Sequence, residues 1–172
     1  MSIDLPHLRE RFLAAQLSGD RREALRLVIE EGLSQGASVQ DLQLGVIQEA
    51  QRQIGELWQQ NRVTVAQEHL ATAISHMALS HVYDYAAPAP ANGATVLVAC
   101  VEGELHDFPA RIVADGLDLA GFTVRYLGAN VPTDDLVRMV CDTRPDLVAL
   151  SVTMAFNLPA LRTAVARLRA DA

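Results

Sequence analysis

The sequence predicts a four-helix bundle at the N-terminus, followed by a parallel α/β domain. In residues 1–86, apolar side chains recur at the three- and four-residue spacing of amphipathic helices. Residues 87–94, APAPANGA, are rich in Pro, Ala and Gly, which favours a linker. In residues 95–172, short apolar runs alternate with helical segments, which is typical of a parallel sheet with right-handed crossovers.

The composition limits the functions open to this chain. Half of its 172 residues are hydrophobic, so it can bury a substantial core. Its net charge of −7 argues against direct binding of nucleic acid, which needs clustered Lys and Arg. The sequence shows neither a signal peptide nor an apolar run near the ~18 residues of a membrane span, and we expect a cytoplasmic protein. Cys100 and Cys141 lie in apolar segments and are expected to be buried thiols in a reducing compartment.

Four helices are expected in the first domain, each opened by a side chain that can cap a helix. These capping residues are, in chain order, Asp4, Asp20, Ser38 and Thr64. Glu23 and Gln67 stand three residues after the second and fourth caps, which is the spacing of a capping box. The fourth helix is expected to end near Tyr85. The short connections between the helices favour an antiparallel bundle.

Three strands and three helices are expected in the second domain. The strands are predicted at residues 95–101, 123–128 and 145–152, and the helices at residues 109–121, 133–143 and 157–171. The first strand, TVLVACV, is wholly apolar, which favours burial on both faces of the sheet. Doubly wound domains usually have more strands, so this domain is expected to be cut short after its third strand.

Charged side chains crowd the loop after the first strand, EGELHDFP at residues 102–109. It contains Glu102, Glu104, His106 and Asp107, at the edge of the sheet where parallel α/β proteins bind ligands. A carboxylate bound to one imidazole nitrogen fixes the tautomer and makes the other nitrogen a better metal ligand. The alternative is a solvated polar loop with a spare histidine, because loops at strand ends are often polar.

The segment ELHDFP resembles the Asp-x-His-x-x-Gly signature of cobalamin-binding domains, which have a Rossmann-like (flavodoxin-like) fold. The resemblance implies that His106 is the lower axial ligand of cobalt, that Glu104 hydrogen-bonds it, and that Asp107 belongs to the same binding loop. YLGANVP, residues 126–132, looks like the family's second-strand exit, and SVT, residues 151–153, looks like the element that lines the slot of the nucleotide tail. The further cofactor-binding residues implied are Gly128, Asn130, Val131, Ser151 and Thr153.

The loop departs from the family pattern at two positions. Glu104 stands where many members have Asp, and the same hydrogen bond is expected from it. Pro109 replaces the signature glycine, which gives the chain room to turn beside the cofactor. Proline fixes φ and lacks an N–H, but it suits the first turn of a helix.

The stretch WQQNRVTVAQEH, residues 58–69, contains the only tryptophan, followed after nine residues by a Glu-His pair. A turn is expected between them, which brings Trp58, Glu68 and His69 to one end of the bundle. Each also has an ordinary explanation: Trp58 as a core residue, and Glu68 as an acid that suits the helix dipole.

The same spacing is similar to that of the adenosylcobalamin-dependent photoreceptor family, related to light-responsive repressors. The resemblance implies that Trp58 packs over the upper ligand, that Glu68 hydrogen-bonds the adenosyl group, and that His69 orders this polar corner. Some members carry, directly after the Trp, a histidine that captures cobalt. Here that residue is Gln59, so a product with two histidine ligands is not expected.

The resemblance implies a light-sensing regulatory protein, not an enzyme, with adenosylcobalamin as its cofactor. The repressors carry a DNA-binding domain before the bundle, and this sequence starts at the bundle. Signalling is therefore expected through a protein partner, an effector domain or a homo-oligomer. One alternative is a corrinoid methyl carrier of a methyltransferase system, which would bind methylcobalamin. A second is a degenerate member that binds haem or another tetrapyrrole.

Overall fold

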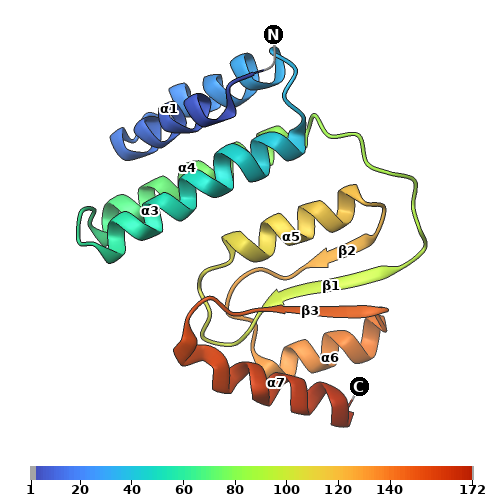
Figure 1. The fold of residues 1–172 in the computed structure, drawn as a ribbon. Coiled ribbons are helices and arrows are strands. Elements are labelled where there is room, and N and C mark those ends of the chain that lie inside the picture. Colours follow the sequence, from blue (N-terminus) through green and yellow to red (C-terminus); the bar gives the residue numbers. More distant parts are fainter. Residues whose placement is uncertain (1–2, 172) are drawn as a thin grey trace. The chain divides into compact units, whose positions relative to one another are not determined.

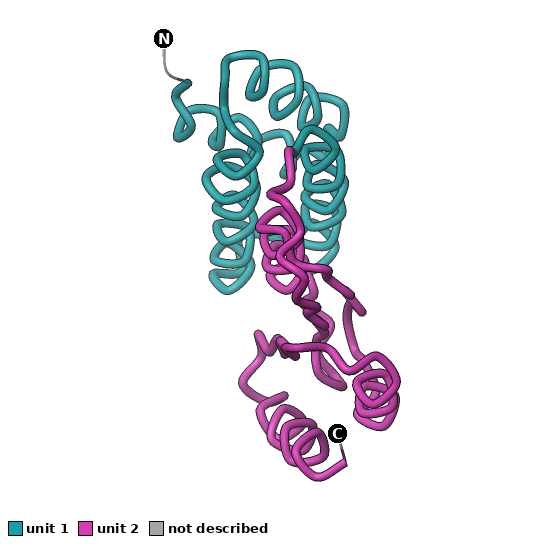
Figure 2. The backbone as a smooth tube through the Cα atoms, turned by 90° about the vertical axis from the view of Figure 1, so that its right-hand side faces the viewer, with its two compact units in different colours: residues 1–86 teal, residues 87–172 magenta. Residues whose placement is uncertain are grey.

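The structure of the protein is a computed structural model that describes residues 3–171 (Figure 1). The chain forms two compact units, Met1–Ala86 and Ala87–Ala172 (Figure 2). The first is helical, and the second is a parallel sheet with helices, as the sequence predicts. Along residues 3–171, no helix is both long enough and apolar enough to cross a membrane.

The helical unit consists of four continuous helical rods within its described residues. The elements are α1 (Leu5–Ser18), α2 (Arg21–Leu25), η1 (Arg26–Leu33), η2 (Asp41–Gln48), α3 (Glu49–Gln59) and α4 (Val65–Tyr83). α2 continues directly into η1, and η2 into α3. The segments η1 and η2 have the wider turns of a π-helix. The two segments pack closely, as the position of Gly32 shows: a Cβ on this residue would lie 2.7 Å from Leu42 Cδ2.

The predicted caps are present at the starts of the rods. Asp4 Oδ1 accepts the His7 N–H at 3.0 Å, and Asp20 Oδ1 accepts the Glu23 N–H at 3.0 Å. The Asp41 N–H donates to Ser38 Oγ at 3.0 Å. Thr64 and Gln67 form the complete capping box of α4. Glu23 does not close its box, since its carboxylate pairs with Arg26.

The core of the helical unit is mostly aliphatic, but it also buries polar side chains. Phe12, Leu27, Leu42, Ile47 and Ile54 are among its fully buried residues. Gln16 and Ser75 are buried as completely as these. Trp58 lies at the end of α3 with 38% of its surface exposed, so it is not a core residue.

The second unit is a three-stranded parallel sheet with strand order β2-β1-β3. Its elements are β1 (Thr95–Cys100), α5 (Phe108–Leu119), β2 (Thr123–Tyr126), α6 (Thr133–Thr143), β3 (Leu147–Ser151), η3 (Ala155–Asn157) and α7 (Leu158–Asp171). Helix α5 covers one face of the sheet, while α6 and α7 cover the other (Figure 1).

The central strand β1 is buried on both faces, as its apolar sequence predicts. Val98 and Cys100 pack against Ala110 of α5 on one face. Leu97 and Ala99 pack against Leu136 of α6 and Ala164 of α7 on the other. The carboxyl end of β1 therefore lies between two well-packed layers, and the loop that follows it starts from a fixed point.

The segment predicted as a linker is hydrogen-bonded to the second unit. The Ala89 N–H donates to Leu119 O at 2.8 Å, and the Asn92 N–H donates to Gly121 O at 2.9 Å. Gly121 has a φ of +90°, and a Cβ at this position would lie 2.3 Å from Pro90 O. The close approach of the two backbone segments therefore requires glycine here.

The prediction that both cysteines are buried is wrong for Cys141. Cys100 is buried in β1, but Cys141 is exposed on α6. Helix α6 turns Leu136 and Val137 toward the sheet, and Cys141 lies on its solvent side. The helix was predicted, but not which of its faces is turned to solvent.

Candidate functional site

The loop after β1 holds a fully buried carboxylate, Glu104, which accepts five hydrogen bonds. Its Oε1 accepts the imidazole Nδ1 of His106 at 2.6 Å and the backbone N–H of the same residue at 3.0 Å. Its Oε2 accepts the N–H groups of Thr153 and Met154, both at 2.9 Å, and Asn157 Nδ2 at 3.0 Å. Burial alone would leave this charge unstable, so the dense set of donors is what allows it.

These donors keep Glu104 ionised. Burial by itself raises the pKa of Glu104, but the hydrogen bonds from Met154, Asn157 and His106 together lower the pKa to about 2. A permanent negative charge therefore faces His106 Nδ1. Neutral histidine then carries its proton on Nδ1, and Nε2 retains its lone pair.

The His106 side chain reaches outward from this anchor. Its side chain is 49% exposed, whereas that of Glu104 is 0% exposed. The nitrogen that Glu104 does not hold, Nε2, is the one that can bind a metal. The structure therefore gives this loop a single oriented imidazole ligand at the carboxyl end of β1.

Glu104 also ties together the loops that follow all three strands. After β2, the Asn130 N–H donates to Glu104 O at 2.8 Å, and Asn130 Oδ1 accepts the Gly103 N–H at 2.8 Å. After β3, Thr153 and Asn157 contact the Glu104 carboxylate directly. The sequence indicated Asn130 and Thr153, but not Asn157. The only sequence feature that could have indicated Asn157 is that it is a polar residue between two apolar ones, Phe156 and Leu158.

Three further residues that the resemblance implies, Gly128, Val131 and Ser151, do not contact Glu104 in the contacts described. Gly128 O accepts the Cys100 N–H at 3.0 Å, and open space surrounds the position of a Cβ on Gly128. The Val131 N–H donates to Cys100 O at 3.2 Å, while its side chain packs into the core on the face of α6 and α7. Ser151 lies at the end of β3 beside a cleft.

Asp107 and Tyr126 fix the start of α5. The Tyr126 hydroxyl donates to Asp107 Oδ2 at 3.0 Å and to Asp107 O at 3.1 Å. Burial and the neighbouring Asp107 charge raise the pKa of Tyr126, so the phenol remains a donor. Pro109, which replaces the signature glycine, is in the first turn of α5, where a missing N–H breaks no helical bond.

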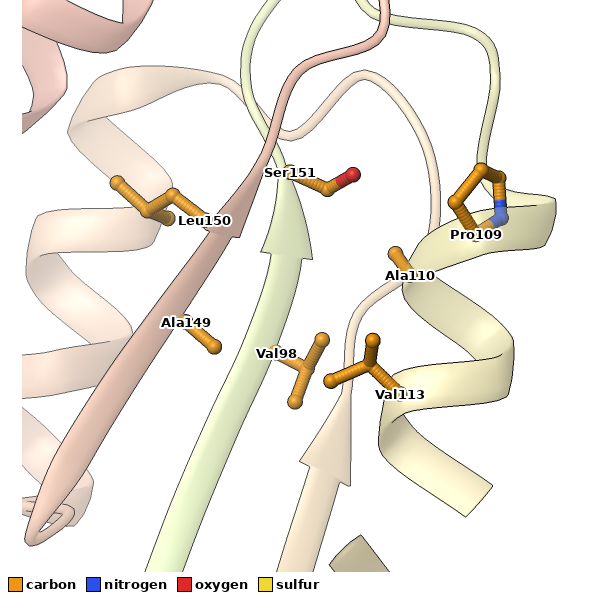
Figure 3. A pocket seen from close by; sticks show the side chains of 7 residues that line it. All are labelled: Val98, Pro109, Ala110, Val113, Ala149, Leu150 and Ser151. Carbon is orange, nitrogen blue, oxygen red and sulfur yellow. The ribbon is translucent and has the colours of Figure 1, made fainter. Parts of the chain in front are cut away.

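An apolar cleft of about 170 Å³ lies between α5 and the sheet (Figure 3). Its lining residues are Val98, Pro109, Ala110, Val113, Ala149, Leu150 and Ser151. They come from β1, α5 and β3, and the hydroxyl of Ser151 lies at the end near Pro109 (Figure 3). The cleft thus begins directly beside the loop that carries His106.

In the helical unit, Trp58 and Glu68 flank the turn between α3 and α4. The Asn61 N–H donates to Trp58 O at 2.9 Å, and Asn61 has a φ of 56°. Glu68 Oε2 and His69 Nδ1 are 2.6 Å apart, with side chains that are 21% and 74% exposed. An exposed tryptophan and a hydrogen-bonded Glu-His pair therefore occupy the same end of this unit.

Two family models for B12 binding domains match the chain, at residues 8–83 and at residues 94–172. The fold and the site define a corrinoid-binding protein, and the helical unit matches a model of this kind in its own right. The chain belongs to the B12-binding domain family, and its cofactor is cobalamin.

Its curated relatives include regulators and methyl-transfer proteins. Over 94 residues, 55% of this chain, it is 40% identical to the HTH-type transcriptional repressor CarA of Myxococcus xanthus. Over 116 residues, 67% of this chain, it is 35% identical to the repressor CarH of the same organism. The matches cover 32% and 38% of those proteins, so the chain spans only about a third of their length.

A third relative is the dimethylamine corrinoid protein 3 of Methanosarcina acetivorans, 28% identical over 144 residues, which are 84% of this chain and 62% of that protein. Among solved structures, the monomethylamine corrinoid protein of Methanosarcina barkeri is similar in fold. It has a TM-score of 0.79 at 16% identity and covers 97% of this chain and 79% of that one.

The residues of the α/β unit fit cobalamin. The corrin ring supplies four nitrogens to cobalt, and His106 Nε2 is an oriented donor that would serve as a further ligand from the protein. Because Glu104 Oε1 accepts from Nδ1, it leaves Nε2 as the nitrogen for a metal. The apolar cleft with the Ser151 hydroxyl is suited to a flat aromatic group with polar substituents.

Proposed function

We propose that the chain is a cobalamin-dependent light sensor with adenosylcobalamin as its working form. The observation that carries the proposal is the exposed Trp58 before the α3–α4 turn and the Glu68–His69 pair after it, at the spacing seen in the photoreceptor family. The likeness to CarA and CarH supports a regulatory role of this kind.

The two units divide the work in this proposal. His106 would hold cobalt through Nε2, and Glu104 holds the imidazole in the required tautomer. Trp58 supplies an apolar surface for the upper ligand, and Glu68 accepts hydrogen bonds from it, while His69 steadies the Glu68 carboxylate. The cofactor supplies a cobalt–carbon bond that light cleaves.

Without the upper ligand, Glu68 would lose the donors that it accepts from, and Trp58 would lose its apolar contact. The packing of the helical unit then changes, and with it the contact to a protein partner, an effector domain or a second copy of the chain. The acidic net charge of −7 makes direct contact with nucleic acid unfavourable, so the signal passes through protein.

The test is to load the chain with adenosylcobalamin in the dark and then illuminate it. We expect the visible spectrum to change within the illumination period and the dark sample to remain stable. The Glu68→Gln variant should bind adenosylcobalamin more weakly than the wild type. A visible spectrum that does not change on illumination would contradict the proposal.

A methyl carrier of a methyltransferase system is the second candidate, favoured by the match to a dimethylamine corrinoid protein over 84% of this chain. It predicts methylcobalamin as the stable form and methyl transfer from a donor enzyme regardless of light. It also predicts that replacing Trp58 or Glu68 leaves cofactor binding intact. Dark binding of both cofactor forms therefore separates the two candidates.

A further inference from the structure

A row of hydrogen-bonded polar side chains runs through the interior of the helical unit and ends on Glu68. Its members, from the buried end outward, are Gln16, Ser75, Gln51, Thr72 and Glu68. We call these five residues the Glu68 relay. They come from α1, α3 and α4, so the relay crosses three helices.

Each bond of the relay has its donor on the side away from Glu68. Gln16 Nε2 donates to Ser75 Oγ at 2.6 Å, and Ser75 Oγ donates to Gln51 Oε1 at 2.8 Å. Gln51 Nε2 donates to Thr72 Oγ1 at 2.6 Å, and the Thr72 hydroxyl donates to Glu68 Oε1 at 2.6 Å. The relay is therefore polarised toward the carboxylate, and its last bond is charge-assisted.

The fold does not need polar groups along this row. Glu68, Thr72 and Ser75 have the i, i+4, i+7 spacing that gives a helix one continuous face, and aliphatic side chains there would pack without desolvation costs. The polar arrangement is not even fully satisfied, because Gln16 Oε1 is buried without a partner. A buried network with this cost points to a task at its exposed end.

Glu68 retains hydrogen-bonding capacity for that task. Its Oε1 is held by Thr72 and, at 3.5 Å, by Gln51 Nε2, while Oε2 contacts only His69 among the contacts described. An ionised carboxylate has about four acceptor positions. With 21% of the side chain exposed, Glu68 can therefore accept a further donor from outside the helical unit.

We propose that the Glu68 relay is a positioning device for the upper ligand. It holds the Glu68 carboxylate in one orientation, and that orientation selects upper ligands that carry hydroxyl donors, such as a ribosyl group, over a methyl group. Thr72, Gln51, Ser75 and Gln16 are positioning residues in this scheme. The inference rests on the proposed role of Glu68 at the upper ligand.

The test compares dark dissociation constants for adenosylcobalamin and methylcobalamin in the full chain. Thr72→Val removes the last donor of the relay with little change of shape. We expect its affinity for adenosylcobalamin to fall about 10-fold, and its affinity for methylcobalamin to change less than about 2-fold. Thr72→Ser keeps a hydroxyl and should restore the preference.

Matched controls separate the relay from a general effect on packing. Thr143→Val removes a hydroxyl that donates to Met139 O, and Ser80→Ala removes one on α4 that donates to His76 O. Neither should change the preference for adenosylcobalamin over methylcobalamin, whereas Ser75→Ala should lower that preference. Thermal unfolding of each variant establishes that it is folded.

Two results would overturn the relay in distinguishable ways. If Glu68→Gln lowers the adenosyl preference but Thr72→Val and Ser75→Ala do not, the relay is wrong and the role of Glu68 stands. If Glu68→Gln leaves the preference unchanged, the role of Glu68 is wrong and the relay fails with it. A crystal structure of Thr72→Val gives an independent answer, since an unmoved Glu68 carboxylate contradicts a positioning role.

Discussion

Glu104 and His106 are joined by two hydrogen bonds, because Glu104 Oε1 accepts both Nδ1 of the imidazole at 2.6 Å and the backbone N–H of His106 at 3.0 Å. The two bonds fix the ring and the chain that carries it. The second oxygen of Glu104, Oε2, accepts from the N–H groups of residues that follow β3. The position of the imidazole is therefore fixed by the loops after two strands, β1 and β3.

The first prediction concerns Glu104→Gln, which keeps the shape of the side chain but replaces an acceptor by an N–H₂ group. That group would face N–H donors from His106 or from residues 153–157. We expect the free energy of unfolding to fall by about 3 kcal/mol, measured by urea denaturation without cofactor. Glu102→Gln is the matched control, because Glu102 is exposed and accepts one bond, from the Thr133 N–H at 3.1 Å. Equal losses in the two variants would contradict the assigned role of Glu104.

A second prediction concerns the pH dependence that Asp115 contributes. Burial raises the pKa of Asp115 above its ordinary value of 3.8, against the opposing effect of Arg111, and Asp115 Oδ2 has no hydrogen-bond partner. The folded state therefore holds this proton more tightly than the unfolded state does. Its contribution to stability is present below pH 3.8 and is lost as the pH rises through the folded pKa.

Asp115→Asn removes this titration and serves as the reference. The difference in unfolding free energy between the wild type and Asp115→Asn should shift against the wild type as the pH is raised from about 3.5 to 7. Urea denaturation of both proteins at several pH values measures it. A difference that is constant with pH, or that shifts toward the wild type, would show that the carboxyl is not desolvated as the structure indicates.

The third prediction concerns the packing of Pro90 on the turn before β2. Gly121→Ala places a Cβ 2.3 Å from Pro90 O at a φ of +90°, and should lower the unfolding free energy by about 2–4 kcal/mol. Gly116→Ala is the matched control, because Gly116 lies inside α5 with nothing within 4 Å of the added Cβ. It should raise stability by about 0.5–1 kcal/mol. Similar melting temperatures for the two variants would contradict this packing.

Trp58→Ala separates binding from stability in the helical unit. Because Trp58 is 38% exposed at the end of α3, its removal should change the unfolding free energy of the cofactor-free protein by less than about 1 kcal/mol. Dark affinity for adenosylcobalamin should fall about 10-fold or more, since the ligand loses an aromatic contact surface. A large loss of stability with unchanged affinity would identify Trp58 as a structural residue.

Much of the fold could be predicted from local pattern. The capping residues placed the starts of the helical rods, and Thr133–Thr143 agrees with the expected helix at residues 133–143. The apolar run of β1 predicted a strand buried on both faces, because such a run suits a central parallel strand. The π-helical turns of η1 and η2 were not predicted, because they depend on packing between segments such as Gly32 and Leu42.

In the candidate site too, contacts between residues close in sequence could be predicted, and contacts between distant residues could not. The Glu104–His106 bond follows from a two-residue spacing, and the sequence could suggest it. Two of the donors after the third strand could not be predicted, because Met154 contributes a backbone N–H and Asn157 lies more than 50 residues away from Glu104 along the chain. The Glu68 relay was also missed, since Gln16 and Gln51 are polar residues that a helical pattern assigns to the surface.

Electron paramagnetic resonance of bound cob(II)alamin tests the central claim most directly. The protein is labelled with ¹⁵N only in its histidine rings, and the unlabelled cofactor is bound in the dark. If His106 Nε2 is the lower ligand, each cobalt line is split into a doublet by ¹⁵N, and the doublet is absent in labelled His106→Ala. A triplet from ¹⁴N in the labelled wild type would mean that the cofactor's own base remains on cobalt, and would contradict the account.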